Sequence, residues 1–189
     1  KKDQLFSGDD RLFKSIVTSP KYHNKSYLEF GVGASSIFVL NNTSLNVVAC
    51  DSSQSWINYV KEQSNNKHAK FIWLDIGKLG NYGRPIDYSK RNLFYNYWTL
   101  PWQQKDFSPS IVLIDGRFRV ACFIKTYLEA DAGTKVFFDD YTHRPEYHVV
   151  EELITPTDVC GEQALFQVPE EKDTNLANRI LAEFTNVLE

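Results

Sequence analysis

Acidic side chains follow two apolar runs of the sequence, and they are strong candidates for chemistry. Asp115 follows the run SIVLI, and Asp139 and Asp140 follow the run TKVFF. Parallel strands that end at one edge of a sheet would bring these three carboxylates together. Such close anions need a divalent cation, an arginine or a bound proton to offset their repulsion. Because oxygen ligands suit Mg²⁺ or Ca²⁺, Asp115, Asp139 and Asp140 are candidate metal ligands.

Basic and proton-transferring side chains lie close to these acids in the sequence. Arg117 and Arg119 follow Asp115, where an arginine would either bind a ligand carboxylate or phosphate or pair with the acids. His143, soon after the acidic pair, is the candidate general base. The alternative for His143 is a surface or packing role.

The segment YLEFGVGASS, residues 27–36, has the composition of a ligand-binding turn. Gly31 and Gly33 permit a sharp turn and a close approach of ligand to backbone. Asp51, at the end of the next strand-like run, could accept hydrogen bonds from two ribose hydroxyls. The alternatives are a tight turn that binds nothing and acids that only cap helices.

Alternating strand-like and helix-like runs must position these groups. We expect strands over 26–30, 46–50, 69–74, 110–114 and 134–138, a hairpin over 157–168, and helices over 9–18, 34–42, 53–64, 119–130, 146–154 and 174–188. This alternation predicts an α/β fold, a three-layer α/β/α sandwich in one domain over 1–189. The sheet should be mostly parallel, with an antiparallel strand near the C-terminus.

One long segment, residues 76–109, interrupts this alternation and is rich in aromatic residues. A connection of this length between strands indicates a function. It would form a lid over the substrate with Arg84 as a polar anchor, or its aromatic residues would pack a small core of their own.

Composition narrows the classes of partner. The net charge is −3, so no overall positive field attracts nucleic acid or an anionic membrane. Cys50, Cys122 and Cys160 are widely spaced and form neither a metal-binding pattern nor a disulfide framework, which favours a reducing cytoplasm. We expect a cytoplasmic protein with a small-molecule substrate; the oligomeric state stays open.

The glycine turn resembles the first motif of the class I S-adenosylmethionine-dependent methyltransferases, acid-x-Gly-x-Gly, at Glu29, Gly31 and Gly33. Asp51 matches the acid of their second motif. The likeness covers roughly residues 25–168 and implies a Rossmann-like methyltransferase fold with S-adenosyl-L-methionine as the cofactor. It also implies that Asp51 binds the cofactor ribose and that the turn over 29–35 holds the methionine part.

Two further positions bear on this resemblance. Asp75 matches the acid that often reaches the adenine amino group of the cofactor, although a turn-forming role is the alternative. Ser35 departs from the pattern, since many members have a third glycine there; we count it among the cofactor-binding residues.

The resemblance implies methyl transfer to a small molecule, more to oxygen than to nitrogen. The three aspartates are similar to those of the metal-dependent catechol and macrocin O-methyltransferases, and the amide- and base-methylating motif Asn-Pro-Pro-Tyr is absent. Asp115 and His143 are the candidate catalytic residues. Alternatives are a non-catalytic member of the fold, and a nucleotide-linked oxidoreductase, which Ser36 at the third glycine position and Glu29 beside a pyrophosphate both disfavour.

Overall fold

A computed structural model describes residues 4–65 and 69–189, which form one seven-stranded sheet. The strand order is β3-β2-β1-β4-β5-β7-β6; the first five strands are parallel, and β7 is antiparallel to its neighbours. The bounds are β1 (Ser26–Phe30), β2 (Asn46–Asp51), β3 (Ala69–Trp73), β4 (Pro109–Ile114), β5 (Lys135–Phe138), β6 (Asp158–Cys160) and β7 (Gln163–Gln167). The predicted fold class and the antiparallel hairpin are confirmed.

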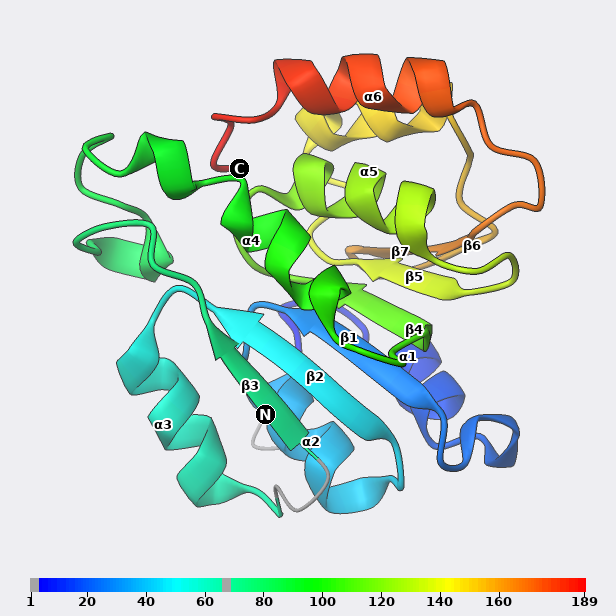
Figure 1. Cartoon of the computed structure of the whole chain (residues 1–189). Coiled ribbons are helices and arrows are strands. Elements are labelled where there is room, and N and C mark those ends of the chain that lie inside the picture. The colour runs from blue at the N-terminus through cyan, green and yellow to red at the C-terminus, as the bar shows by residue number, and fades with distance from the viewer. Residues whose placement is uncertain (1–3, 66–68) are drawn as a thin grey trace.

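Helices cover both faces of this sheet (Figure 1). One face carries α1 (Arg11–Val17), α2 (Ala34–Asn42) and α3 (Gln54–Gln63). The other carries α4 (Asn96–Thr99), α5 (Arg119–Glu129) and α6 (Thr174–Glu183). Short 3₁₀ helices complete the chain: η1 (Pro20–Tyr22), η2 (Asn81–Gly83), η3 (Arg91–Leu93), η4 (Leu100–Gln103) and η5 (Pro145–Glu152).

The core lies in two layers, one on each side of the sheet. Successive strand residues point to opposite faces, so Tyr27 packs with α1, α2 and α3 while Leu28 packs on the side of α5 and α6. The central strands β1 and β4 are buried on both faces, which explains their nearly continuous apolar sequence.

Two predicted helices differ from the structure. The segment predicted as a helix over 146–154 is the eight-residue 3₁₀ helix η5, which has no side-chain cap at its start. The helix predicted over 174–188 ends at Glu183, before the poor helix formers Thr185 and Asn186. The chain then turns, and the carbonyl of Leu188 accepts a hydrogen bond of 2.9 Å from the N–H of Phe118.

The aromatic insert, residues 76–109, consists mainly of short turns and contributes to the main core. Phe94, Tyr97 and Trp98 are buried, and their rings pack against Phe118 at centroid distances of 5.1–5.4 Å. These aromatic residues therefore do pack, but in the main core with α5 and not in a small core of their own. Tyr82 stays exposed.

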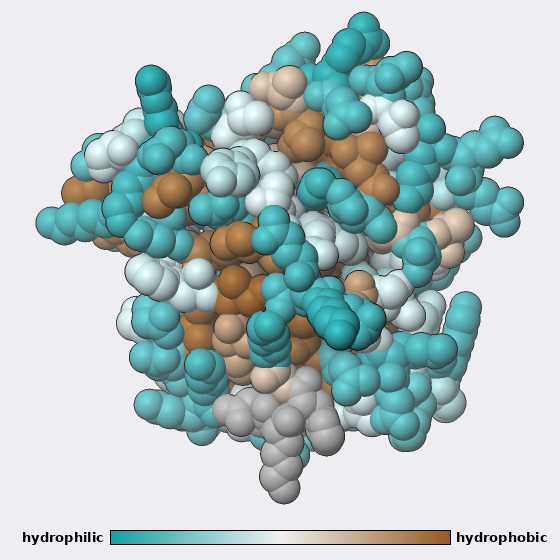
Figure 2. Space-filling view, viewed as in Figure 1, coloured by the Kyte–Doolittle hydropathy of each residue, from teal (hydrophilic) through white to brown (hydrophobic). Residues whose placement is uncertain are grey.

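The surface is mostly hydrophilic in the view of Figure 2, with hydrophobic side chains reaching it near the middle of that face. Among residues 4–65 and 69–189, every helix is too short or too polar to cross a bilayer. The three cysteines are free thiols.

Candidate functional site

A cavity of about 450 Å³ opens at the carboxyl ends of the central strands. The strand order reverses between β1 and β4, and open α/β sheets bind ligands at such a switch point. The walls come from the glycine turn, the end of β2, the start of α3, the insert and the β4–α5 turn: Gly31, Val32, Asp51, Ser52, Ser53, Trp56, Tyr82, Gly83, Tyr97, Asp115, Gly116, Arg117 and Arg119. This volume is typical of a small-molecule site.

The backbone N–H groups of Gly31, Val32 and Gly33 are all used inside the protein. The N–H of Gly31 donates to the carbonyl of Cys50, that of Val32 to Asp51 Oδ2, and that of Gly33 to Ser36 Oγ. A pyrophosphate-binding turn must instead offer such donors to the phosphates. The turn of this protein therefore suits a ligand held by other contacts.

Gly31 is the glycine that the geometry requires. Its φ is +90°, and a Cβ atom there would lie 2.5 Å from the carbonyl oxygen of Asp115, which is a backbone atom and cannot rotate away. Gly33 has extended backbone with φ of −177°, and a Cβ there would meet only Trp56 Nε1, at 3.8 Å. Neighbouring protein atoms therefore leave room for a side chain at Gly33, and the expected close approach of a ligand there stays a prediction.

Glu29 and Ser35 lie beneath the turn and are absent from the cavity wall. Glu29 is fully buried, and its two carboxylate oxygens accept hydrogen bonds from Tyr27 Oη at 3.0 Å and Ser35 Oγ at 2.5 Å. Burial raises the pKa of Glu29 to about 7, although these hydroxyl groups lower it. The geometry thus ties strand β1 to the first turn of α2, and the hydroxyl of Ser35 makes this contact where a third glycine could not.

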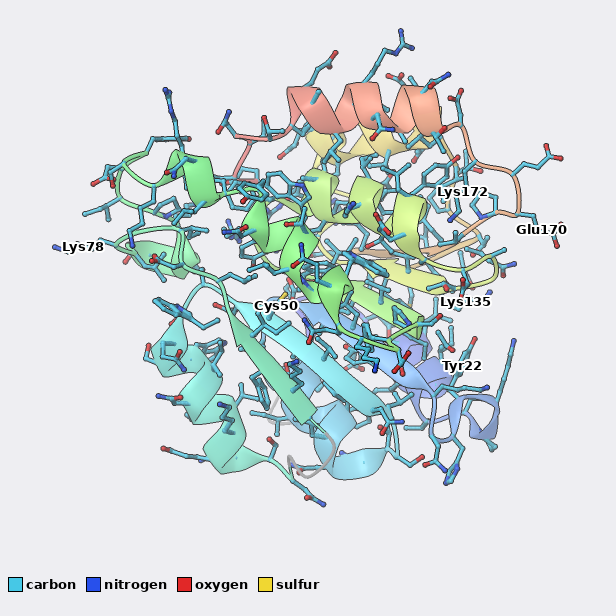
Figure 3. All side chains as sticks on the ribbon, viewed as in Figure 1. Tyr22, Cys50, Lys78, Lys135, Glu170 and Lys172 are labelled. Carbon is cyan, nitrogen blue, oxygen red and sulfur yellow. The ribbon has the colours of Figure 1, made fainter. Side chains whose placement is uncertain are left out.

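Asp51, like Gly31, is a predicted cofactor residue that does line the cavity. Its Oδ2 accepts the N–H of Val32 at 3.0 Å, and its Oδ1 accepts the N–H of Ser53 at 2.7 Å. Figure 3 labels Cys50, the residue before Asp51, at the end of β2. Each carboxylate oxygen has two acceptor sites, so Asp51 can hold the turn and still accept bonds from a ligand's hydroxyl groups.

Sequence reasoning missed two aromatic residues of the wall. Trp56 on α3 is 45% exposed, stacks on Tyr59, and donates from Nε1 to the carbonyl of Val32. Tyr97 of the insert uses its hydroxyl to accept the N–H of Arg117 at 3.1 Å. The sequence offered one signal for Tyr97, the aromatic insert, but none for the outward position of Trp56.

The three aspartates after β4 and β5 converge, as predicted. One oxygen from each of Asp115, Asp139 and Asp140 lies within 4.8 Å of the others. Arg119 lies among them: its Nη2 is 3.0 Å from Asp115 Oδ1 and 3.2 Å from Asp140 Oδ2. Arg119 is also fixed by the carbonyls of Gly116 and Asp139, so its guanidinium has little freedom to leave.

Burial changes the protonation of this cluster. Desolvation raises the pKa of Asp139, and the nearby charges of Asp115 and Asp140 raise it further. Desolvation also raises the pKa of Asp115, while Arg119 opposes that shift. The repulsion among the three carboxylates is therefore offset in two ways, by the positive charge of Arg119 and by a proton bound at Asp139.

Like Glu29 and Ser35, the predicted site residues Asp75 and His143 lie outside the cavity wall, as do Gly33, Asp139 and Asp140. Asp75 pairs with Lys90 and accepts the N–H of Gly77, an arrangement typical of a turn residue. His143 is exposed in the loop after β5 and does not line the cavity. The structure does not bring His143 to the cavity beside Asp115.

Comparison of the sequence with family models and with curated proteins gives no match. Comparison with solved structures gives many matches. A methyltransferase-like protein from Silicibacter pomeroyi DSS-3 is 25% identical and superposes with a TM-score of 0.82, over 98% of this chain and 99% of that one.

A second similar structure is the N-methyltransferase NodS from Bradyrhizobium japonicum WM9, solved in complex with S-adenosylhomocysteine. It is 13% identical, with a TM-score of 0.55 over 85% of this chain and 87% of that one. At this identity the similarity concerns the fold alone. The strand order, the site at its switch point and these neighbours agree: the chain has the Rossmann-like fold of the class I S-adenosylmethionine-dependent methyltransferases.

Proposed function

We propose that this protein transfers the methyl group of S-adenosylmethionine to a small-molecule acceptor, with oxygen as the methylated atom. The observation that carries the proposal is the position of Asp51 in the cavity wall, beside a turn whose Gly31, Val32 and Gly33 N–H groups all bond inside the protein. A carboxylate for the ribose, next to N–H groups that are already used, fits this cofactor and disfavours a dinucleotide.

The residues of the cavity fit the cofactor in a definite way. Asp51 would accept the ribose hydroxyl groups, and Trp56 and Tyr82 would flank the bound molecule from α3 and the insert. The bound cofactor supplies a methyl group on a positively charged sulfur. The protein then has to bring the acceptor oxygen in line with that methyl group, which is chiefly a task of positioning.

Asp115 is the proposed proton acceptor. It lies in the cavity wall, and its raised pKa makes it a better base than an exposed carboxylate. Asp115 would take the proton that the acceptor hydroxyl group loses when it is methylated. Arg119, paired with Asp115, would keep that carboxylate oriented. With Asp115 as the proton acceptor, His143, the other candidate base, has no role in the proposed reaction.

A divalent cation fits the three carboxylates less well. Arg119 contacts an oxygen of both Asp115 and Asp140, and Gln163 Nε2 donates to Asp139 Oδ1 at 3.1 Å. A cation would have to displace a guanidinium that is almost fully buried. We infer that Arg119 takes the place of the Mg²⁺ or Ca²⁺ that the sequence also allowed, and no step of the proposed reaction uses a metal.

Calorimetric titration with S-adenosylhomocysteine tests the proposal. Wild-type protein should bind it and should not bind NAD. Asp51→Ala should weaken binding by about 1.5–3 kcal/mol, the usual worth of a hydrogen bond to a charged group. Asp158→Ala, on the exposed edge strand β6, is the matched control and should bind normally. Tight NAD binding would refute the proposal; cofactor binding without methyl transfer to any acceptor would favour the non-catalytic alternative.

A further inference from the structure

Arginines from three separate segments meet at one carboxylate beside the cavity. Arg84 belongs to the insert, Arg117 to the turn after β4, and Arg144 to the loop after β5. Arg84 Nη2 contacts Glu189 Oε1, while Arg117 Nη1 and Arg144 Nη1 lie 3.6 and 3.7 Å from Glu189 Oε2. Figure 1 shows the segment that ends at Glu189 beside α4 and the insert.

One carboxylate cannot neutralise three guanidinium groups. Within the described part of the chain, Glu189 is the only carboxylate that either Arg84 or Arg117 contacts within 4 Å. Arg144 has a second partner, Asp140, at 2.8 Å. Counted by ion pairs, these three arginines face two carboxylates, and removing Glu189 would leave Arg84 and Arg117 without an ion pair.

The cluster opens on the cavity through Arg117. The side chain of Arg117 is only 13% exposed and lines the cavity, and its backbone N–H is held by Tyr97 Oη. Arg144 is held by the hydroxyl of Tyr147 at 3.0 Å. The backbone of Arg117 and the guanidinium of Arg144 are thus held in position, and a planar guanidinium binds carboxylate and phosphate oxygens with defined geometry.

We propose that Arg84, Arg117 and Arg144 form a subsite for an oxyanion group, a carboxylate or a phosphate, on the methyl acceptor, and that Glu189 fills it until the acceptor arrives. The role of this ligand as methyl acceptor rests on the proposed methyl transfer, whereas anion binding at this subsite does not. The acceptor would enter by displacing the Glu189 side chain, which is one-third exposed. Substrate selection would then depend on charge at one end of the acceptor and on a hydroxyl group at the other.

Anion titration of the full chain tests this subsite. Inorganic phosphate and acetate are titrated separately by calorimetry, with and without S-adenosylhomocysteine. Glu189→Gln removes the competing charge and should raise the affinity for at least one anion by about 10-fold or more over wild type. Tighter binding of phosphate assigns a phosphate ester as acceptor, and tighter binding of acetate assigns a carboxylic acid. Glu183→Gln, which removes the same charge from an exposed position of α6, should change neither affinity.

A second variant shows where the anion binds. Adding Arg117→Gln to Glu189→Gln should cancel the gain in affinity, because it removes the arginine nearest the cavity. An unchanged affinity in Glu189→Gln, or a gain that survives Arg117→Gln, would overturn the subsite. Binding of S-adenosylhomocysteine is measured on the same samples. If the protein does not bind S-adenosylhomocysteine but Glu189→Gln gains affinity for an anion, methyl transfer alone is refuted. If the protein binds S-adenosylhomocysteine and no such gain appears, the subsite alone is refuted.

Discussion

At the scale of single residues, the pKa of Glu29 gives the sharpest expectation. Burial raises it from 4.5 to about 7, so the folded state prefers the protonated carboxyl. The stability that this preference contributes is fully present below about pH 4.5 and is lost as the pH rises through about 7. Glu29→Gln keeps the shape and cannot ionise. The unfolding free energy of wild type minus that of Glu29→Gln should fall by about 3 kcal/mol between about pH 4.5 and pH 8.

Urea denaturation across that pH range measures the difference. Glu62→Gln, at an exposed position of α3, is the matched control and should show no such step relative to wild type. If the difference in unfolding free energy between wild type and Glu29→Gln does not change with pH, Glu29 is not desolvated. Glu29 would then again be a candidate for binding the amino group of the cofactor in the cavity.

At the scale of elements, the turn between β1 and α2 depends on the absence of a side chain at Gly31. Gly31→Ala should destabilise the protein by more than about 2 kcal/mol, because both the positive φ and the clash with the Asp115 backbone are unfavourable. Gly133→Ala is a close control: its φ is +87° and nothing lies within 4 Å of its Cβ position. Gly133→Ala should lose only about 1 kcal/mol of unfolding free energy, which is the cost of a positive φ at alanine. Equal losses of unfolding free energy in the two variants would contradict the close approach of Asp115 to Gly31.

The same scale shows what the sequence could predict. Strands β1 and β4 are buried on both faces, so their apolar runs predicted the bounds to within one residue. The run of β4 placed Asp115 directly after its end, and the run of β2 placed Asp51 at its own end. The wall positions of Tyr82 and Tyr97 could not be predicted, because the insert has no periodic pattern and its position depends on contacts with α5. Local sequence likewise gave no sign that Glu29 points away from the cavity.

At the scale of the whole molecule, one network of charges joins β4, β5, the insert and the segment after α6. It runs from Asp115 through Arg119, Asp140 and Arg144 to Glu189. Because Arg119 already neutralises the acids, wild-type protein should bind neither Mg²⁺ nor Ca²⁺ at millimolar concentration in a calorimetric titration. Arg119→Gln should gain such binding, since it leaves Asp115 without an ion pair and Asp140 with Arg144 alone.

Lys125→Gln, which removes one positive charge from the same helix α5, should not gain cation binding and serves as the control. Stoichiometric binding of either cation to wild type, lost in Asp140→Ala, would restore the metal site that the three aspartates suggested.

The position of Trp56 has a practical consequence. Its indole ring is half-exposed in the cavity wall, with its N–H bonded to the carbonyl of Val32 in the glycine turn. Trp98, in contrast, is buried in the core beside Phe118. A ligand that enters the cavity replaces water against the Trp56 ring and leaves the surroundings of Trp98 unchanged. The protein therefore carries its own fluorescent reporter at the site, so the rate of ligand entry can be followed optically without attaching a dye.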